Sequence, residues 1–166
     1  MKNFEFEYEG KKLWYSRSVA AVGLVISYDE CNRYVLACKR GPGCPDEVGK
    51  WALPCGYLDF NESIEECMSR EANEETGIII NPKEWQLIGI DSNPDEDSRQ
   101  NITIRFGTII HKMPIICYEP NNEVTEVEFI KVNEYDKYNW AFNHNELIKN
   151  YAVGLSWYEE KFSNGV

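Results

Sequence analysis

Three glutamates within five residues, Glu71, Glu74 and Glu75, are the side chains of this sequence best placed to do chemistry. They follow apolar residues with helical spacing, and Glu71 and Glu75 continue the stripe that Ile64 and Met68 begin. Neighbouring carboxylates at i,i+3 and i,i+4 repel each other by roughly 0.2–0.5 kcal/mol per pair. Carboxylates on a core-facing stripe also need neutralisation. Clustered carboxylate oxygens suit hard divalent ions, so the spacing predicts a site for Mg²⁺ or Mn²⁺.

A solvated acidic helix face is the alternative interpretation of these glutamates, and it is the better one for most Glu-rich helices. Here it would leave anions in line with the buried stripe. Glu74 and Glu75 also fall in the last helical turn, where the helix dipole disfavours each anion by about 0.3–1 kcal/mol. A bound cation removes both conflicts, so we favour the metal site.

Two helices and five strands must position these residues. The first helix is expected over residues 61–76, with acidic residues in its first turn and Gly77 at its end. The second is expected over residues 143–162, where Asn143 and Glu146 resemble a capping box. Segments rich in β-branched residues predict strands over residues 18–27, 34–38, 86–91, 102–110 and 127–132. This order predicts one domain over residues 1–166 of the α/β or α+β class, with layers on both faces of a mixed sheet.

The composition excludes several classes of partner. The 166 residues include 28 acidic and 17 basic side chains, a net charge of −11. Such a chain lacks the basic surface that nucleic acids and anionic membranes require. Its apolar runs are shorter than the roughly 20 residues of a membrane span, and its first residues do not resemble a signal peptide. We therefore expect a cytoplasmic protein with six free cysteines and neither nucleic acid nor membrane as a partner.

The segment around the glutamates resembles the Nudix box, whose pattern is G-x5-E-x7-R-E-U-x-E-E-x-G-U with U an aliphatic residue. The matching residues are Gly56, Glu62, Arg70, Glu71, Ala72, Glu74, Glu75, Gly77 and Ile78. Chance agreement at one register is on the order of one in a billion at average residue frequencies. Residues 51–56 and 141–144 also resemble family segments, namely the W-x-x-P-G-G entry to the box and the start of the terminal helix.

The resemblance implies a Nudix-type α/β/α sandwich that hydrolyses a nucleoside diphosphate linked to another moiety, with Mg²⁺ or Mn²⁺ as cofactor. It implies Glu71, Glu74 and Glu75 as metal ligands, Arg70 as the residue that orients Glu71, and Glu62 as a partner of Arg70 or of metal-bound water. The backbone carbonyl of Cys55 would complete the metal shell. The family usually has glycine at this position, so Cys55 requires a negative φ. Family members are frequently homodimers, which implies a homodimer here.

The candidates for the general base are Glu71 and the glutamates of residues 119–128. Among the latter we favour Glu126 or Glu128. Both alternate with apolar neighbours, so the solvent side of an edge strand is an equal alternative.

For the substrate, the candidates are Arg40, Arg99 and Arg105 near phosphate or ribose, and the aromatic residues Trp51, Tyr57 and Trp140 against a base. An ion pair at the surface or a place in the core is the alternative for these residues. His144 is expected to pack or cap at a helix start.

The substrate expected from the resemblance is ADP-ribose or an ADP-sugar. Members that cleave ADP-ribose often have a proline about fifteen residues beyond the box, and Pro94 lies sixteen beyond Ile78. A dinucleoside polyphosphate or an oxidised nucleoside triphosphate is the alternative substrate. A non-catalytic sensor of ADP-ribose-like ligands is the alternative from another class, but a sensor has no need of three metal carboxylates.

Overall fold

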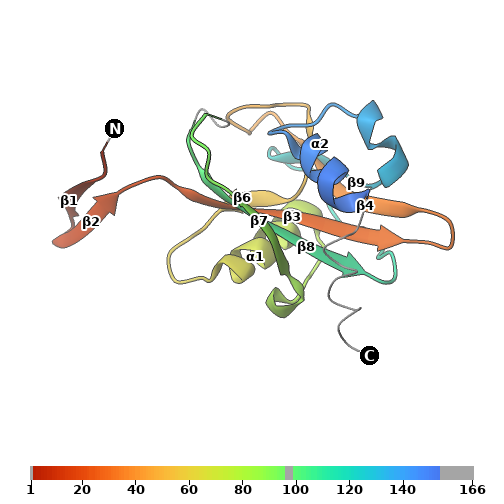
Figure 1. Cartoon of the computed structure of the whole chain (residues 1–166), viewed down its shortest axis with the longest axis horizontal. Coiled ribbons are helices and arrows are strands. Elements are labelled where there is room, and N and C mark those ends of the chain that lie inside the picture. The colour runs from red at the N-terminus through yellow and green to blue at the C-terminus, as the bar shows by residue number, and fades with distance from the viewer. Residues whose placement is uncertain (1, 96–98, 154–166) are drawn as a thin grey trace.

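The sheet at the centre of the chain is mixed and has seven strands. We describe it from a computed structural model in which residues 2–95 and 99–153 are described. The strand order is β5-β4-β3-β8-β7, with β6 paired to β3 and β9 paired to β4 (Figure 1). Among the paired strands of the described residues, β3 and β8 alone run parallel. The strands are β3 (Val19–Tyr28), β4 (Arg33–Arg40), β5 (Trp51–Ala52), β6 (Cys55–Tyr57), β7 (Gln86–Asp91), β8 (Ile102–Ile110) and β9 (Val124–Lys131).

Helical segments cover both faces of this sheet. Side chains alternate along β3, so Ala21 and Val25 pack with the helix α1 (Ile64–Thr76). Val22 and Leu24 point the other way, toward α2 (His144–Leu147) and the π-helical turn η3 (Ile148–Ala152). The predicted sandwich with a mixed sheet is therefore confirmed.

The helix α1 begins and ends with strong local signals. Ser63 is its N-cap and forms a capping box with Glu66, so the helix begins at Ile64, three residues later than predicted. Gly77 ends it with φ 72°, a left-handed conformation that residues with a side chain rarely adopt. These two ends fix which face of α1 meets the sheet.

The second helix differs from its prediction. The N-cap residue Asn143 makes no side-chain capping bond, so the predicted capping box with Glu146 is wrong. The reason is the backbone: Asn143 has φ 60°, whereas a capping residue has an extended backbone that aims its side chain at the first helical amides. Four α-helical residues then pass into η3. Residues 154–162 of the predicted helix lie outside the described residues.

An additional hairpin precedes the sheet and was not predicted. It consists of β1 (Phe4–Tyr8) and β2 (Lys11–Tyr15) and stands apart from the sheet in Figure 1. Its five aromatic side chains are 40–68% exposed. The 3₁₀ turns η1 (Pro82–Glu84) and η2 (Val132–Lys137) complete the described elements. All six cysteines are free thiols, as expected. None of the helices in the described ranges has the length and apolar content of a membrane span.

Candidate active site

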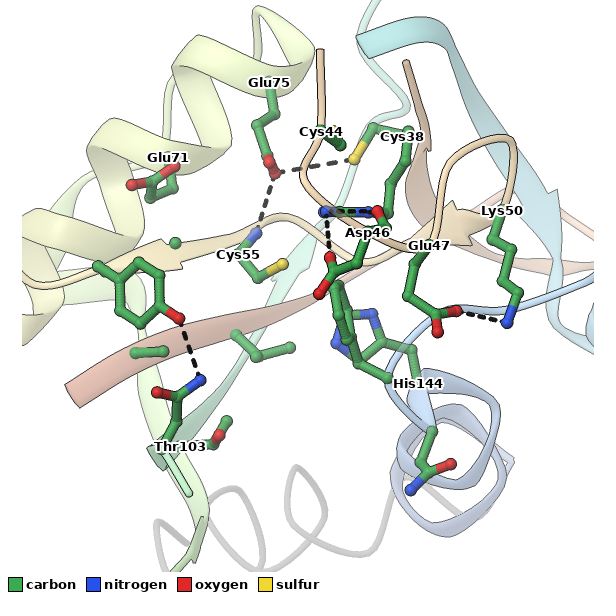
Figure 2. A pocket seen from close by; sticks show the side chains of 18 of the residues that line it. Cys38, Cys44, Asp46, Glu47, Lys50, Cys55, Glu71, Glu75, Thr103 and His144 are labelled. Atoms are coloured by element: carbon green, nitrogen blue, oxygen red, sulfur yellow. Dashed lines mark hydrogen bonds and ion pairs between the residues drawn. The ribbon is translucent and has the colours of Figure 1, made fainter. Parts of the chain in front are cut away.

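A cavity of about 620 Å³ lies between the C-terminal half of α1 and the turn that begins α2. Glu71 and Glu75 are on one side of it and His144 is on the other, with Cys55 between them (Figure 2). We call the side formed by Cys55, Gly56, Glu71 and Glu75 the acidic end. The distal end is formed by Arg40, Asp46, Arg99, Phe142 and His144.

Glu75 is the most buried carboxylate of the acidic end. Its Oε2 accepts a hydrogen bond from the Cys55 amide at 2.9 Å and lies 3.7 Å from the Cys38 Sγ (Figure 2). Burial, together with the charge of Glu71, raises the pKa of Glu75 to about 8, against the opposing effect of the Cys55 amide. Burial also raises the pKa of Glu71. The ionised forms of these two glutamates therefore lack sufficient positive charge from the chain itself.

Gly56 gives Glu71 the room to enter the cavity. A Cβ at position 56 would lie 2.0 Å from Oε1 of Glu71, far inside van der Waals contact. Strand β6 brings Gly56 to this place by pairing it with Ala21 of β3. The first glycine of the sequence pattern is therefore required by the close approach of a carboxylate to the backbone.

Arg70 organises the carboxylates next to the cavity. Its guanidinium donates to Glu62 at 2.7 and 3.1 Å, to Glu71 at 2.6 Å and to Glu74 at 3.2 Å, and also to the carbonyl of Tyr57 at 3.0 Å. These bonds raise the pKa of Arg70, and the bond to Arg70 lowers the pKa of Glu62 to about 2. The pair of Glu62 and Arg70 is the one that the resemblance implied, and the bond from Arg70 fixes the orientation of Glu71.

The acidic end has carboxylate oxygens of the kind that bind a hard divalent ion, but they do not surround one common position. Among the described residues, no three His, Cys, Asp or Glu side chains stand close enough together to hold an ion. Glu71 and Glu75 line the cavity, whereas Glu74 is 57% exposed and bonded to Arg70. Glu74 would have to leave Arg70 to join Glu71 and Glu75 at an ion. Cys55 is not among the described residues with positive φ, so its side chain is accommodated as the metal-ligand prediction required.

The distal end brings two arginines and an aromatic ring together. Arg40 donates to the carboxylate and carbonyl of Asp46 at 3.1–3.2 Å, and its guanidinium lies 4.7 Å from the ring centre of Phe142. Arg99 forms an ion pair with the same Asp46 and lies 6.0 Å from the same ring. Phe142 and Asn143 both have positive φ, of 53° and 60°. Each such residue costs about 1–3 kcal/mol, and strain of this kind is concentrated at binding sites.

His144 holds the turn of the distal end to the sheet. Its Nδ1 accepts a hydrogen bond from the amide of Leu53 at 3.0 Å, and the side chain is buried. Burial, together with the charges of Arg40 and Arg105, lowers the pKa of His144 to about 3. His144 is thus a neutral acceptor that packs at the helix start, as one of the two sequence expectations stated.

Between the two ends, polar side chains from β6, β7 and β8 form the wall of the cavity. The hydroxyl of Tyr57 is 3.2 Å from both Arg99 Nη1 and Asn101 Nδ2. Arg105 forms an ion pair with Asp91 at 2.7 Å. These residues place hydrogen-bond donors along the path from the carboxylates to Phe142.

The chain matches the NUDIX domain over residues 17–151, most of its length. The chain belongs to the Nudix family. It is 36% identical over 142 residues to the ADP-ribose pyrophosphatase of Methanocaldococcus jannaschii, covering 84% of this chain and 76% of that protein. The chain is a Nudix pyrophosphohydrolase by these two relationships.

Solved structures show the same Nudix fold. The NUDIX domain of Shewanella oneidensis NrtR, complexed with ADP ribose, has a TM-score of 0.74 at 19% identity, covering 86% of this chain and 90% of that chain. A bifunctional NMN adenylyltransferase/ADP ribose pyrophosphatase from Francisella tularensis, complexed with AMP and a Mn ion, has a TM-score of 0.69 at 20% identity, covering 84% of this chain and 42% of that chain.

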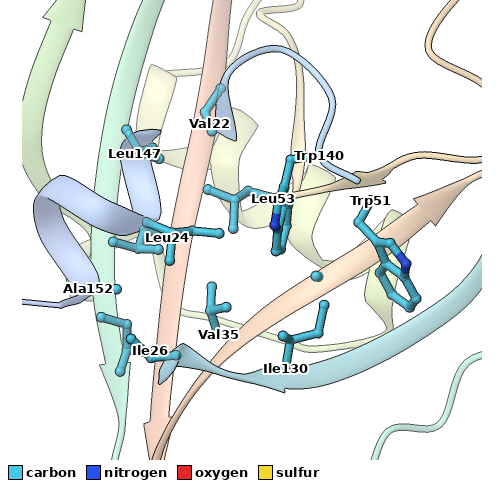
Figure 3. Close-up of a cluster of buried hydrophobic side chains, with 13 residues drawn as sticks. Val22, Leu24, Ile26, Val35, Trp51, Leu53, Ile130, Trp140, Leu147 and Ala152 are labelled. Carbon is cyan, nitrogen blue, oxygen red and sulfur yellow. The ribbon is translucent and has the colours of Figure 1, made fainter. Parts of the chain in front are cut away.

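Four of the five predicted substrate-binding residues line the cavity of this Nudix domain, namely Arg40, Tyr57, Arg99 and Arg105. The fifth, Trp51, is not among the described lining residues. It lies in the core cluster with Trp140 (Figure 3). Its ring packs edge-on against that of Tyr138, with 5.6 Å between the ring centres. Trp51 is 8% exposed because β5 pairs it with Lys39 of β4, inside the sheet layer. The structure therefore assigns it the core alternative, and Trp140, though also buried, reaches the cavity wall.

The two glutamates favoured as the base, Glu126 and Glu128, lie on the exposed side of β9. Glu126 pairs with Lys39 at 2.7 Å, and neither glutamate is among the described residues that line the cavity. This is the solvent-side alternative of the strand pattern. Glu123, from the same predicted range of residues 119–128, does line the cavity.

Asp46 and Phe142 also line the cavity but were not predicted as site residues. The family-like segment of residues 141–144 contains Phe142. Its sequence does not show that Phe142 has a positive φ, which directs the ring to the cavity.

Proposed function

We propose that this protein hydrolyses the pyrophosphate bond of ADP-ribose or an ADP-sugar, with Mg²⁺ or Mn²⁺ as cofactor. The products would be a nucleoside monophosphate and a phosphorylated remainder. The observation that carries the proposal is one cavity with partly buried carboxylates at one end and an aromatic ring with arginines at the other. The similarity to an ADP-ribose pyrophosphatase and the position of Pro94 support the substrate.

The acidic end would carry the reaction. Pyrophosphate hydrolysis requires charge neutralisation and an aligned water more than covalent chemistry by the protein. A divalent ion held by Glu71, Glu74, Glu75 and the carbonyl of Cys55 would supply positive charge and an activated water. Arg70 keeps Glu71 oriented for that role, and Gly56 leaves the space that the carboxylate needs. The oxygen of water bonds to one phosphorus as the bridging P–O bond breaks, and the bridging oxygen leaves on the other phosphate.

Glu123 is the glutamate that we propose as general base for the attacking water. It comes from the predicted segment and lines the cavity, whereas Glu126 points to Lys39. Glu123→Gln should lower kcat by about 10²–10⁴-fold, the usual contribution of a general base. Glu126→Gln is the matched control and should leave kcat within about twofold. Equal losses from the two substitutions would remove Glu123 from this role.

The distal end would bind the rest of the nucleotide. Phe142 offers a ring for stacking with adenine, and the guanidinium groups of Arg40 and Arg99 can donate hydrogen bonds to phosphate and ribose oxygens, as can that of Arg105 in the cavity wall. The cavity volume of about 620 Å³ lies within the range of roughly 300–1,000 Å³ that is usual for small-molecule sites. The size therefore suits a ligand with two phosphates, a base and a second sugar.

A substrate panel with Mg²⁺ and with Mn²⁺ tests the function. It contains ADP-ribose, an ADP-sugar, a dinucleoside polyphosphate and an oxidised nucleoside triphosphate, and it measures nucleotide release. We expect the highest kcat/KM with ADP-ribose or the ADP-sugar. Turnover of the other two nucleotides without turnover of ADP-ribose would replace the substrate proposal. Binding of ADP-ribose without hydrolysis would indicate the sensor alternative.

We also propose that the protein acts in the cytoplasm as a homodimer, with neither nucleic acid nor membrane as a partner. The net charge of −11 supports the absence of polyanionic partners. The exposed aromatic side chains of the hairpin β1–β2 support contact with a second copy, because an isolated two-stranded hairpin is only marginally stable in water. Light scattering should give twice the mass of the 19.3 kDa chain. A monomer at micromolar concentration would contradict the dimer.

A further inference from the structure

Arg17 joins the start of β3 to a distant loop. Its guanidinium donates to the carbonyl of Ser92 at 2.9 Å, to that of Asn101 at 2.9 Å and to that of Gln100. Ser92 directly follows β7, and Gln100 and Asn101 directly precede β8. One side chain therefore ties together the two ends of the β7–β8 connection.

The C-terminal end of this connection carries two residues of the cavity. Arg99 contacts Asp46 and Phe142 at the distal end, and Asn101 donates to the hydroxyl of Tyr57 at 3.2 Å. Arg17 itself is not among the described residues that line the cavity. Its hydrogen bonds reach the peptide groups at and beside these residues, so it acts on the cavity only through the backbone.

The backbone at Gln100 shows why this support is needed. Gln100 has φ 56°, a left-handed conformation that is unfavourable for a residue with a side chain. Such conformations persist where the surroundings enforce them. The bond from Arg17 Nε to the Gln100 carbonyl is part of that enforcement. The planar guanidinium presents donors in several fixed directions, which lysine cannot do from a single ammonium group.

We propose that Arg17 is a positioning residue that sets the affinity for the substrate by holding Arg99 and Asn101 at the cavity. The inference rests on the proposed function to the extent that these two residues contact the nucleotide. The carboxylates of α1 do not touch Arg17, so the reaction step itself should not depend on it. A loss of Arg17 should consequently raise KM and leave kcat nearly unchanged.

Arg33 provides a matched control within the same chain. It donates to two backbone carbonyls, those of Ala152 at 3.1 Å and Val153 at 2.9 Å. The chemistry is the same as at Arg17, but the clamped segment follows α2 and Arg33 is not among the described residues that line the cavity. A general loss of stability from removing a carbonyl clamp would appear in both variants.

The kinetic test compares Arg17→Ala, Arg17→Lys and Arg33→Ala on the best substrate of the panel. We expect Arg17→Ala to raise KM by roughly 5–20-fold with kcat within about twofold, and Arg17→Lys to recover only part of the affinity. Arg33→Ala should leave KM within about twofold. An equal rise of KM in Arg33→Ala, or a fall of kcat without a change of KM in Arg17→Ala, would overturn the proposal.

A double-mutant cycle tests whether Arg17 acts through the two cavity residues. In a background of Arg99→Ala with Asn101→Ala, adding Arg17→Ala should raise KM by less than about twofold, because the groups it positions are gone. A full additional rise of KM in that background would show that Arg17 acts by another route.

Amide hydrogen exchange without substrate separates this inference from the proposed function. Exchange at the amide of Ile102, which donates to the Ser18 carbonyl at 2.8 Å, should become at least about tenfold faster in Arg17→Ala and stay unchanged in Arg33→Ala. Unchanged exchange in Arg17→Ala would refute the positioning role, whatever the substrate is. Faster exchange in a protein that hydrolyses no nucleotide would support the positioning of the loop and refute only the proposed reaction.

Discussion

The acidic end and the distal end of the cavity are built in different ways. Every residue of the acidic end comes from positions 55 to 75, where one strand is followed by one helix. The distal end combines positions 40, 46, 99, 142 and 144, which come from three stretches far apart in the sequence. A local pattern thus specifies the reactive groups, whereas the whole fold assembles the groups that face the rest of the ligand.

The two ends also differ in how far the chain compensates their charges. At the distal end, Arg40 and Arg99 share the carboxylate of Asp46, so positive and negative groups are already paired. At the acidic end, the raised pKa values of Glu71 and Glu75 report carboxylates that the chain leaves partly uncompensated. An incoming cation therefore has most to gain at the acidic end, and an incoming phosphate must compete with Asp46 at the distal end.

Removing a carboxylate from the acidic end should have the largest effect. We expect Glu75→Gln to lower kcat by at least about 10²–10³-fold, the scale of losing one charge contact in a transition state, and Glu74→Gln with Glu75→Gln to lower it further. Steady-state hydrolysis with saturating Mg²⁺ measures the change.

Glu65→Gln is the matched control, because it removes the same charge from the first turn of α1. It should leave kcat within about twofold. A double variant as active as the wild type would exclude a catalytic role for this end.

Metal removal should affect stability through the acidic end alone. Mg²⁺ at about one hundred times its Kd should stabilise the wild type by roughly 2.7 kcal/mol, because it binds the folded state, and chelation should reverse the effect. For a domain of this size that is a rise of about 5–10 °C in Tm, measurable by differential scanning fluorimetry. The rise should shrink strongly in Glu75→Gln and persist in Phe142→Ala. An equal rise in both variants would place the ion elsewhere.

Truncating the ring of the distal end should change affinity more than turnover. Phe142→Ala should raise KM by about tenfold with kcat within about twofold, because stacking with a base contributes roughly 1–3 kcal/mol. Phe60→Ala provides the control, since Phe60 is 89% exposed and is not among the described lining residues. A tenfold fall of kcat at constant KM would instead link Phe142 to the reaction step.

The elements predicted well from the sequence are those with a long local signal. The strands over residues 86–91 and 102–110 have the predicted bounds, and α1 carries a capping residue, an apolar stripe and a terminal glycine. The bond between Glu62 and Arg70 was implied by the resemblance to the Nudix box and not by helical spacing, because Glu62 lies before the N-cap residue Ser63. By contrast, β5 and β6 have only two and three residues, too few to show a period, and only pairing with β4 and β3 defines them.

The distal end was predicted least well because tertiary contacts override its local signals. Asn143 and Glu146 have the residue types of a capping box, yet the turn takes positive φ at positions 142 and 143. The bond from Leu53 to His144 links that turn to a segment ninety-one residues away, which no local pattern contains. For Glu126 and Glu128 the local pattern was correct but insufficient. The alternation along β9 places both on one face of the strand, but it does not show which face meets the cavity.

The pH dependence of stability should report the buried histidine of the distal end, with the smallest effect. The pKa of His144 is lowered to about 3 in the folded protein, against about 6.5 when unfolded. Above pH 6.5 both states are neutral. As the pH falls below 6.5 only the unfolded state takes up the proton, so the free energy of unfolding should decrease, by about 1 kcal/mol at pH 6.

In His144→Asn the amide oxygen can still accept the bond from Leu53, but the group does not titrate. The variant should therefore lose less stability than the wild type between pH 7.5 and pH 6 in urea unfolding. Parallel pH profiles would mean that His144 is protonated in the fold, and that the turn presenting Phe142 is held by a charged group.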